Sequence, residues 1–561
     1  LKIFARIPGP PFLDFRANKL LASPMAERES FSDGEASEDP LDSPGRHSAG
    51  SQHSFVINHT DSAESVNVNH VHSELQRVIP KVAESIAEME VTNPEVLRVA
   101  PAFSAFQNLA VALRVGCDGD FYYKSQKSEK ISTFWSHSWH GGQWKKILTL
   151  LTFYNGPAAI LFAFVIATLM MILFVSGYLP SLDRGFWELY FSVWCLPCGF
   201  VVATMVMLLW RSQTKVFLDR ICISQQDQDL KAQAIFSLAG LLKNSDVMLI
   251  LWDPTWTERL WCLFELAAFL KSKKTSSRKQ TLIVRPIFLG PISIAVFVFC
   301  TAVCLPFLTV SFDNAVEGLL GVVVPAALVA SFAAYPAVAT ARNYFQQLNI
   351  MKQQLLAISF DTTRSSCCDQ NHKSPSGQSM LCDREVVKEC VNIWFGSQEA
   401  FEETVRSEVL EILTINLSER VFTTTWVLAV SSPFIWTFMD LSASVWNIPW
   451  DASLLTHHSF GFMIEALAAW LVALPKFKDV SIMLCRVTHA KHKVWYIEIL
   501  KNLLVMSIMA VLISIFLALY VLTRFFTIYA SWVWSGSMVV YALLLHLLAR
   551  GMKIFMTQSG W

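Results

Sequence analysis

Apolar residues occur along this chain in long, almost uninterrupted runs that are separated by polar segments. Eight of these runs are about 20 residues long, the length that an α-helix needs to cross the hydrocarbon core of a bilayer. They lie near 157–178, 187–210, 288–310, 319–339, 422–445, 455–474, 503–522 and 527–549. The fifth run is the weakest, because it is rich in Ser and Thr and contains Pro433 and Asp440. The pattern predicts a mainly α, polytopic membrane protein with about eight transmembrane helices.

Lys and Arg are distributed unevenly among the gaps between these runs. The first, third and fifth gaps are short and carry only Arg184 among them. The second, fourth and sixth gaps, at 211–285, 342–420 and 476–493, are long and basic. Because basic loops stay on the cytoplasmic side, we expect these gaps and both termini in the cytosol.

Composition agrees with a membrane protein whose partner is the lipid bilayer: 53% of the residues are hydrophobic and 16% are charged. The net charge is +0, and no basic stripe with interleaved aromatics indicates a nucleic-acid partner. The 12 cysteines are scattered without the spacing of a disulfide framework, which favours a reducing cytosolic side. The opening "LKIFARIPGPPFLDF" lacks the pattern of a signal peptide.

The polar segments differ in what they predict. Residues 1–73 are expected to be a disordered tail, since the stretch from about Ser23 to Ser73 is rich in Ser, Asp, Glu and His and has few large apolar residues. Residues 74–130 show helical spacing and predict a helical lead-in, limited by Pro80. In 341–421, two amphipathic helices are expected to meet at 395–397. The other expected parts are spans at 157–210, 288–340, 422–475 and 503–549, a basic loop at 476–502 and a tail at 550–561.

The second gap carries an alternation of strands and helices. "KVFLDRICISQ" predicts a short strand ending in Asp219, "VMLILW" a buried strand ending in Trp252, and "TLIVRPIF" a third strand. A helix is expected between the first two, and Thr255 or Thr257 could cap the helix that follows Trp252. This alternation predicts parallel βαβ units, so Asp219 and the loop after Trp252 should meet at the carboxyl edge of the sheet.

The helix after Trp252 carries Trp261-Cys262-Leu263-Phe264-Glu265-Leu266, which resembles the W-C-x-x-E-L signature of Toll/interleukin-receptor (TIR) domains. "STFWSHSWHGGQWKK" at 132–146 resembles the first strand and loop of that family. "LDRICISQ" at 218–225 is similar to the D-x-C-I-x-Q core of heterokaryon-incompatibility domains. The resemblance implies a small, flavodoxin-like α/β domain with a parallel sheet, assembled from 131–146 and 211–287 and completed by 341–421. It covers about 90 residues, and two predicted spans stand where the family has a single helix.

The resemblance also implies two functions. In TIR domains that cleave NAD, the matching glutamate is the essential acid, so Glu265 would be the catalytic residue of an NAD hydrolase and would stabilise positive charge on the ribose. NAD would then bind near Ser136, His137, Asp219 and Trp252. Many TIR domains instead mediate only self-association, and we favour signalling or assembly through a homo-oligomer of the module over NAD cleavage.

The loop "FWSHSWHGGQW" also has two interpretations. His137, His140 and the two glycines could face a nucleotide. Trp135, Trp139 and Trp144 could instead anchor the segment at the membrane interface, which we favour.

Two groups of cysteines have elements of a metal site. Cys367, Cys368, His372, Cys382 and Cys390 lack the usual spacing of zinc motifs, so unligated thiols are expected and no metal is predicted. Cys195 and Cys198 form C-x-x-C inside a predicted span, where packing is the expected role.

Asp440, Glu465 and His546 are ionisable residues within predicted spans, where charge is costly. They could form an ion or proton path in a transporter or channel. Alternatively, Asp440 lies near an interface and Glu465 pairs with a neighbouring helix. The chain shows no repeat between its halves that would favour transport.

Overall fold

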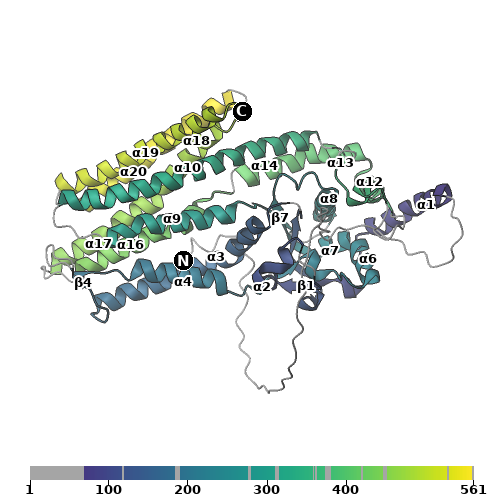
Figure 1. Cartoon of the computed structure of the whole chain (residues 1–561), viewed down its shortest axis with the longest axis horizontal. Helices are drawn as coiled ribbons and strands as arrows, with labels where there is room; N and C mark the ends of the chain where they lie inside the picture. The colour runs from purple at the N-terminus through teal and green to yellow at the C-terminus, as the bar shows by residue number, and fades with distance from the viewer. Residues whose placement is uncertain are drawn as a thin grey trace, which may run out of the picture.

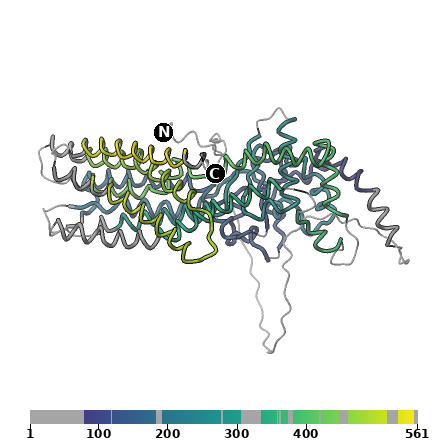
Figure 2. Tube along the Cα trace, turned by 90° about the horizontal axis from the view of Figure 1, so that it is seen from above, coloured from purple at the N-terminus to yellow at the C-terminus, as the bar shows by residue number. Residues whose placement is uncertain are grey.

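The computed structural model of the protein describes residues 68–116, 119–139, 141–183, 190–275, 280–309, 315–357, 359, 363–372, 381–418, 421–446, 452–526 and 530–558. Most of the expected disordered tail lies outside these residues. A bundle of long helices forms one end of the molecule and a sheet covered by shorter helices forms the other (Figure 1). The view from above shows the same two parts side by side along the long axis (Figure 2).

The sheet has six strands in the order β2-β1-β6-β3-β7-β8. Their bounds are β1 Arg98–Pro101, β2 Gln126–Lys127, β3 Ile131–His137, β6 Lys215–Phe217, β7 Ser245–Trp252 and β8 Thr281–Pro286. β6, β3, β7 and β8 are parallel, whereas β1 pairs antiparallel with both β2 and β6. The sheet is therefore mixed, and the expectation of a parallel sheet is wrong at this edge. The two antiparallel strands come from the predicted helical lead-in, and at four and two residues they are too short to show a strand period in sequence.

Among the parallel strands, the first in the chain lies between the second and the third. β3 pairs with β6 on one side, through Thr133 opposite Val216, and with β7 on the other, from Ile131 opposite Ser245 to His137 opposite Leu251. The chain therefore leaves β3 and β7 toward opposite sides of the sheet. The carboxyl ends of β3 and β7 mark the switch point at which open α/β sheets form their crevices.

Shorter helices complete this α/β body. The single helix expected before β7 is two, α6 Gln228–Phe236 and α7 Leu238–Lys243, interrupted at Ser237, whose hydroxyl accepts a hydrogen bond from the Thr92 N–H. α1 (Val68–Ala87) runs on through Pro80, which therefore does not end it.

The segment after the fourth predicted span folds back onto this body. α12 (Asp383–Phe395) and α13 (Gln398–Thr404) meet at Gly396, where the sequence predicts a junction and where φ is +89°. A π-helical turn, Val405–Val409, then leads into α14, Leu410–Ser418. α12 packs on α1, and the Trp394 indole donates a hydrogen bond to the Ala87 carbonyl.

The bundle contains α3 Gln143–Val175, α4 Cys195–Leu209, α9 Leu289–Thr309, α10 Ala315–Leu356, α15 Thr424–Val430, α16 Ser432–Trp446, α17 Ala452–Ala468, α18 Leu474–Val487, α19 Trp495–Phe526 and α20 Ala530–Gln558. A π-helical turn, Ala469–Ala473, joins α17 to α18. Within the described residues, four helices are long and apolar enough to cross a membrane, or five if the bent pair α15 and α16 forms one span. The protein is thus mainly helical with a small mixed sheet, and the count of eight spans stays a prediction.

The bundle and the sheet are joined by very short connections. α3 begins at Gln143 after β3 ends at His137, β6 begins at Lys215 after α4 ends at Leu209, and α9 begins at Leu289 after β8 ends at Pro286. The small hairpin β4 (Leu182–Asp183) and β5 (Tyr190–Phe191), between α3 and α4, lies at the opposite end of the bundle (Figure 1).

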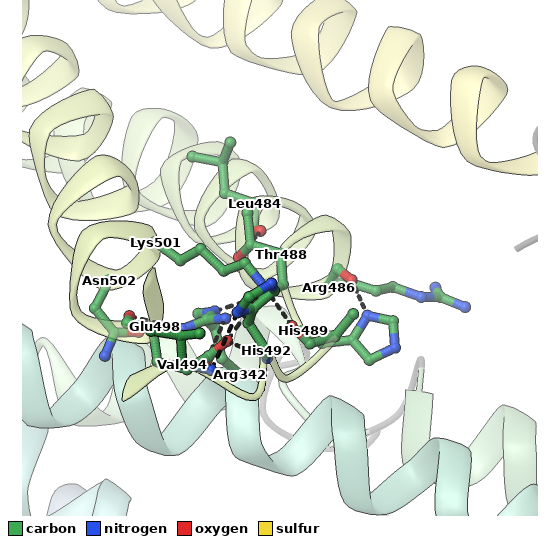
Figure 3. A network of polar contacts seen from close by, with 11 residues as sticks. Arg342, Leu484, Arg486, Thr488, His489, His492, Val494, Glu498, Lys501 and Asn502 are labelled. Atoms are coloured by element: carbon green, nitrogen blue, oxygen red, sulfur yellow. Dashed lines mark hydrogen bonds and ion pairs between the residues drawn. The ribbon is translucent and has the colours of Figure 1, made fainter. Parts of the chain in front are cut away.

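α10 runs along the bundle and continues beside the α/β body (Figure 1). Its Arg342 is buried at 4% exposure and holds the turn between α18 and α19 (Figure 3). The guanidinium donates to the Thr488 carbonyl at 2.6 and 2.9 Å, to the Glu498 carboxylate at 2.9 Å and to the Asn502 side chain at 2.5 Å. Two residues later, the centroid of the Tyr344 ring lies 4.4 Å from that of Phe288 and 6.2 Å from that of Trp252. One helix therefore contacts both the turn between α18 and α19 and the end of β7.

Candidate functional site at the carboxyl edge of the sheet

The structure places Ser136, His137, Asp219 and Trp252 at one edge of the sheet. Ser136 and His137 end β3, Trp252 ends β7, and Asp219 begins the short helix α5 (Asp219–Cys222) just after β6. Trp139 bridges two of them, because its indole donates a 3.0 Å hydrogen bond to Asp219 and its ring lies 4.6 Å from that of His137. This is the edge at which parallel α/β sheets bind ligands.

Glu265 lies beneath this edge on α8 (Leu260–Thr275). Its carboxyl group accepts a 2.5 Å hydrogen bond from the Ser136 hydroxyl, which in turn accepts a 3.1 Å hydrogen bond from the Trp256 indole. Burial raises the pKa of Glu265 to about 8, the Ser136 hydrogen bond opposes this shift, and the charge of Asp219 adds to it. At neutral pH the carboxyl group is therefore mostly protonated and uncharged.

α8 is enclosed on its other faces too. Leu263 and Phe264 are each 1% exposed, and Glu265 is 9% exposed. The Phe264 ring lies 5.5 Å from that of Trp394 on α12, and the Trp261 indole donates a 3.2 Å hydrogen bond to the buried Asp383. Side chains pack closely around Glu265, and this enclosure weakens the case for catalysis by this residue.

The start of α8 differs from the sequence prediction. The helix begins at Leu260, so neither Thr255 nor Thr257 caps it. The Leu260 N–H donates instead to the Arg364 carbonyl at 3.2 Å. The partner for this free N–H comes from a segment about 100 residues later, which no local capping pattern can reveal.

The sequence analysis missed a buried polar group beside Ser136, composed of Ser138, Lys146 and Asp253. Lys146 is 2% exposed and its ammonium donates to the Ser138 carbonyl. Asp253, 3% exposed, accepts from the Thr255 N–H at 2.9 Å through Oδ1, and among the described residues its Oδ2 has no hydrogen-bond partner. A Cβ on Gly141 would lie 2.0 Å from that Oδ2, so the glycine permits the close approach. The Gly141-Gly142 pair and the Asp253-Pro254 turn are the features of the sequence that could have pointed to this group.

The three tryptophans of the β3 loop have separate roles. Trp135 is 3% exposed and its indole donates a 2.8 Å hydrogen bond to the Tyr154 hydroxyl, so it is a core residue. Trp139 is bonded to Asp219. Trp144, at 50% exposure, has the surface position that a membrane anchor needs, whereas the anchoring interpretation is wrong for the buried Trp135. His140 lies outside the described residues.

Four of the five thiol and imidazole groups noted in the sequence lie together. The ligand atoms of Cys367, Cys368, His372 and Cys382 are all within 4.8 Å of one another. Cys390 is elsewhere, with its thiol directed to the Ala83 carbonyl. The sequence spacing gave no reason to expect this grouping.

Asp440 on α16 caps the N-terminal end of α4. Its carboxylate accepts hydrogen bonds from the N–H groups of Trp194, Cys195 and Leu196 at 2.9–3.0 Å and from the Ser192 hydroxyl at 2.6 Å. A carboxylate at a helix N-terminus satisfies N–H groups that have no partner within the helix. This role accounts for Asp440 without a transported ion.

The other two ionisable residues of the predicted spans differ in their surroundings. Glu465 is fully buried on α17, whereas His546 on α20 is exposed.

The chain matches no protein-family model, no curated protein and no solved structure, so the functional argument rests on the residues themselves.

Proposed function

We propose that the protein is a multi-pass membrane signalling protein in which a TIR-like cytosolic module and the membrane helices move as one unit. The order of the four parallel strands, second-first-third-fourth along the sheet, supports the TIR-like assignment because flavodoxin-like folds begin with this order. Eight spans with cytosolic termini put every connection to the sheet on the cytosolic side.

The observation that carries this proposal is the direct continuation of strands into membrane helices. Three of the four parallel strands connect to a bundle helix through a few residues, at β3 to α3, α4 to β6 and β8 to α9. A tethered but independent module would need a flexible linker instead. Because packed elements shift as rigid pieces, tilting or sliding of α3 or α9 would displace β3 or β8.

Hydrogen bonds also join α3 to α9 close to the sheet, so the two helices should move together. The Thr149 hydroxyl on α3 donates to the Ile287 carbonyl at 2.7 Å and accepts from the Gly290 N–H at 3.0 Å. Ile287 and Gly290 lie on either side of the start of α9. A single buried hydroxyl therefore joins the two membrane helices where they leave the sheet.

Removal of this hydroxyl tests the coupling. Thr149→Val keeps the shape of the side chain and removes both bonds, so amide hydrogen exchange should rise in β3 and β8 as well as in α3 and α9. Thr152→Val is the matched control, because within the described part of the chain the Thr152 hydroxyl bonds only to Leu148 and Thr149 of its own helix. Faster exchange confined to α3 in Thr149→Val would contradict the proposal.

In this proposal Glu265 joins β3 to α8 and is not a catalytic acid. A protonated carboxyl group offers no negative charge to stabilise a cationic ribose. The alternative, NAD cleavage at the switch point, is favoured by the convergence of Asp219, Ser136 and Glu265 at one edge. Detergent-purified protein should release no nicotinamide from NAD, and release that disappears in Glu265→Ala would establish the alternative.

A further inference from the structure

The side chains of Cys367, Cys368, His372 and Cys382, here called the Cys3His cluster, converge outside the sheet. The Cys368 sulfur lies 3.8 Å from the Cys367 sulfur, 4.0 Å from the Cys382 sulfur and 3.6 Å from His372 Nε2. Cys367 is buried, and the other three side chains are half-buried or at the surface. Three thiols and one imidazole thus share a small space.

The three separations from the Cys368 sulfur are close to those around a tetrahedral zinc ion. With Zn–S distances of about 2.3 Å and Zn–N distances of about 2.0–2.1 Å, tetrahedral angles place two sulfurs about 3.8 Å apart and a sulfur and a nitrogen about 3.6 Å apart. A disulfide would instead bring two sulfurs to about 2.0 Å. The geometry therefore fits a shared metal ion better than an oxidised pair.

The backbone around His372 is shaped to bring the imidazole into this cluster. Asn371 and His372 have φ of +51° and +56°, a left-handed conformation that non-glycine residues adopt infrequently. The His372 N–H donates to the Cys367 carbonyl at 2.8 Å and the Asn371 N–H to the Cys368 carbonyl at 3.1 Å, at the end of the short helix α11 (Ser366–Asp369). This reversal returns His372 to the side of Cys368.

Neighbouring groups hold the Cys367 sulfur in place. The Asp383 N–H donates to it at 3.3 Å, and the Ser365 hydroxyl lies 3.0 Å away. Outer hydrogen bonds of this kind orient ligands and tune a metal site.

We propose that the Cys3His cluster binds a structural zinc ion. Four protein ligands leave no open position for a substrate, as in structural rather than catalytic zinc sites, and thiolates with imidazole favour zinc over the oxygen-binding cations Mg²⁺ and Ca²⁺. The ligands follow the spacing C-C-x3-H-x9-C, which explains why motifs built on C-x-x-C did not reveal them.

The ion would fix the segment that completes α8. Arg364 pairs with Arg259 in a parallel bridge and accepts the Leu260 N–H at the start of α8. On the other side of the cluster, Asp383 begins α12 and accepts from the Trp261 indole. Loss of the metal would therefore loosen these two contacts of α8.

The test measures zinc in the full-length, detergent-purified protein. The wild type should contain about one zinc ion per chain, whereas His372→Ala and Cys382→Ser should lose it. Cys390→Ser, which removes a buried thiol outside the cluster, should retain the zinc. His372→Cys should also retain it, because a four-cysteine set is a common zinc ligand set.

Reconstitution of the wild type with Co²⁺ tests the site directly, so the proposal can still be tested if the ligand variants do not fold. The wild type should give the visible absorption of tetrahedral, thiolate-ligated Co²⁺, and addition of Zn²⁺ should remove it. Wild type without zinc and without this absorption would overturn the proposal. Zinc content unaffected by both ligand variants, or a disulfide among the three cysteines in anaerobically purified protein, would also overturn it. Ser365→Ala should weaken binding by about 10-fold while the absorption keeps its shape.

Discussion

The Ser136 hydroxyl donates a 2.5 Å hydrogen bond to the Glu265 carboxyl group, although the two residues are 129 positions apart. The bond joins the end of β3 to the second turn of α8, and the bundle helix α3 begins seven residues after Ser136. Because Ser136 is fully buried, neither partner can exchange this bond for water while the body is folded. Glu265 thus contributes to the packing of the helix whose signature sequence pointed to chemistry.

Substitutions of Glu265 should show whether the stability of the protein depends on its hydrogen bond with Ser136 or on its carboxyl charge. Glu265→Gln keeps an oxygen that can accept from Ser136 and should leave the apparent Tm of the purified protein at pH 7 unchanged or raised. Glu265→Ala leaves the Ser136 hydroxyl without its acceptor and creates a cavity, at a cost of about 2–4 kcal/mol in unfolding free energy. Thermal unfolding followed by tryptophan fluorescence measures both, and equal losses in the two variants would contradict this role.

The pH dependence of stability should carry the signature of a buried, protonated acid. The pKa of Glu265 is about 8 in the folded protein and 4.5 ordinarily, so between these values the folded state holds a proton that the unfolded state releases. The stability that Glu265 contributes is fully present below about pH 4.5 and is lost as the pH rises toward about 8. Glu265→Gln should therefore show a shallower fall in Tm than the wild type over this range. Parallel curves for the two proteins would count against the raised pKa.

Asp440 should act as a cap of α4 and not as part of an ion path. Asp440→Ala leaves three backbone N–H groups and the Ser192 hydroxyl without this acceptor, so the apparent Tm should fall by more than in Asp440→Asn, which keeps one carbonyl oxygen. Purified protein in liposomes should show no ion flux above that of empty vesicles. Flux that is lost in Asp440→Asn or Glu465→Gln at unchanged Tm would restore the transport hypothesis.

Local patterns in the sequence predicted the elements that are long or strongly apolar. Runs of apolar residues and punctuation by Gly and Pro predicted the parallel strands β6, β7 and β8, the helix carrying Glu265 and the junction at Gly396. Strand β3 was expected only from the resemblance to TIR domains. β1 and β2 were not predicted, because strands of only four and two residues carry almost no periodic signal. The burial of α8 was also not predicted, because α12 packs against it through Trp394 and Asp383, which are more than 100 residues away in sequence.

The candidate site shows the same limit. Parallel strand topology predicted that Asp219 and the loop after Trp252 would share an edge, and this much needs only strand order. Nothing local indicated that Lys146, on a membrane helix, would turn back to the Ser138 carbonyl, or that Cys382 would lie beside Cys368. These contacts depend on how separate segments pack, which spacing rules do not describe.

Asn416 provides a test of the predicted topology. It lies in the sequon "NLS" on α14, within the segment between the fourth and fifth predicted spans. Because glycan transfer requires a lumenal position, the protein from eukaryotic cells should show no change in mobility on endoglycosidase treatment or in Asn416→Gln. A sequon-bearing cassette inserted into the third gap, predicted to be lumenal, should be glycosylated. Glycan at Asn416 would reverse the predicted orientation of this segment.

Gly290 should be the least replaceable glycine where the bundle meets the sheet. A Cβ at this position would lie 2.3 Å from the Thr149 nitrogen and 2.4 Å from the Leu148 carbonyl carbon, both backbone atoms of α3. Gly290→Ala must therefore push α9 away from α3 and weaken the bonds of Thr149, so we expect a loss of about 1–3 kcal/mol in stability. Gly551→Ala on α20 is the control, since nothing lies within 4 Å of a Cβ there and alanine favours the helix by up to about 1 kcal/mol. The apparent Tm should fall in the first variant and hold or rise in the second. Because α3 and α9 both continue from strands of the sheet, hydrogen exchange in β3 and β8 should increase together with the fall in Tm of Gly290→Ala.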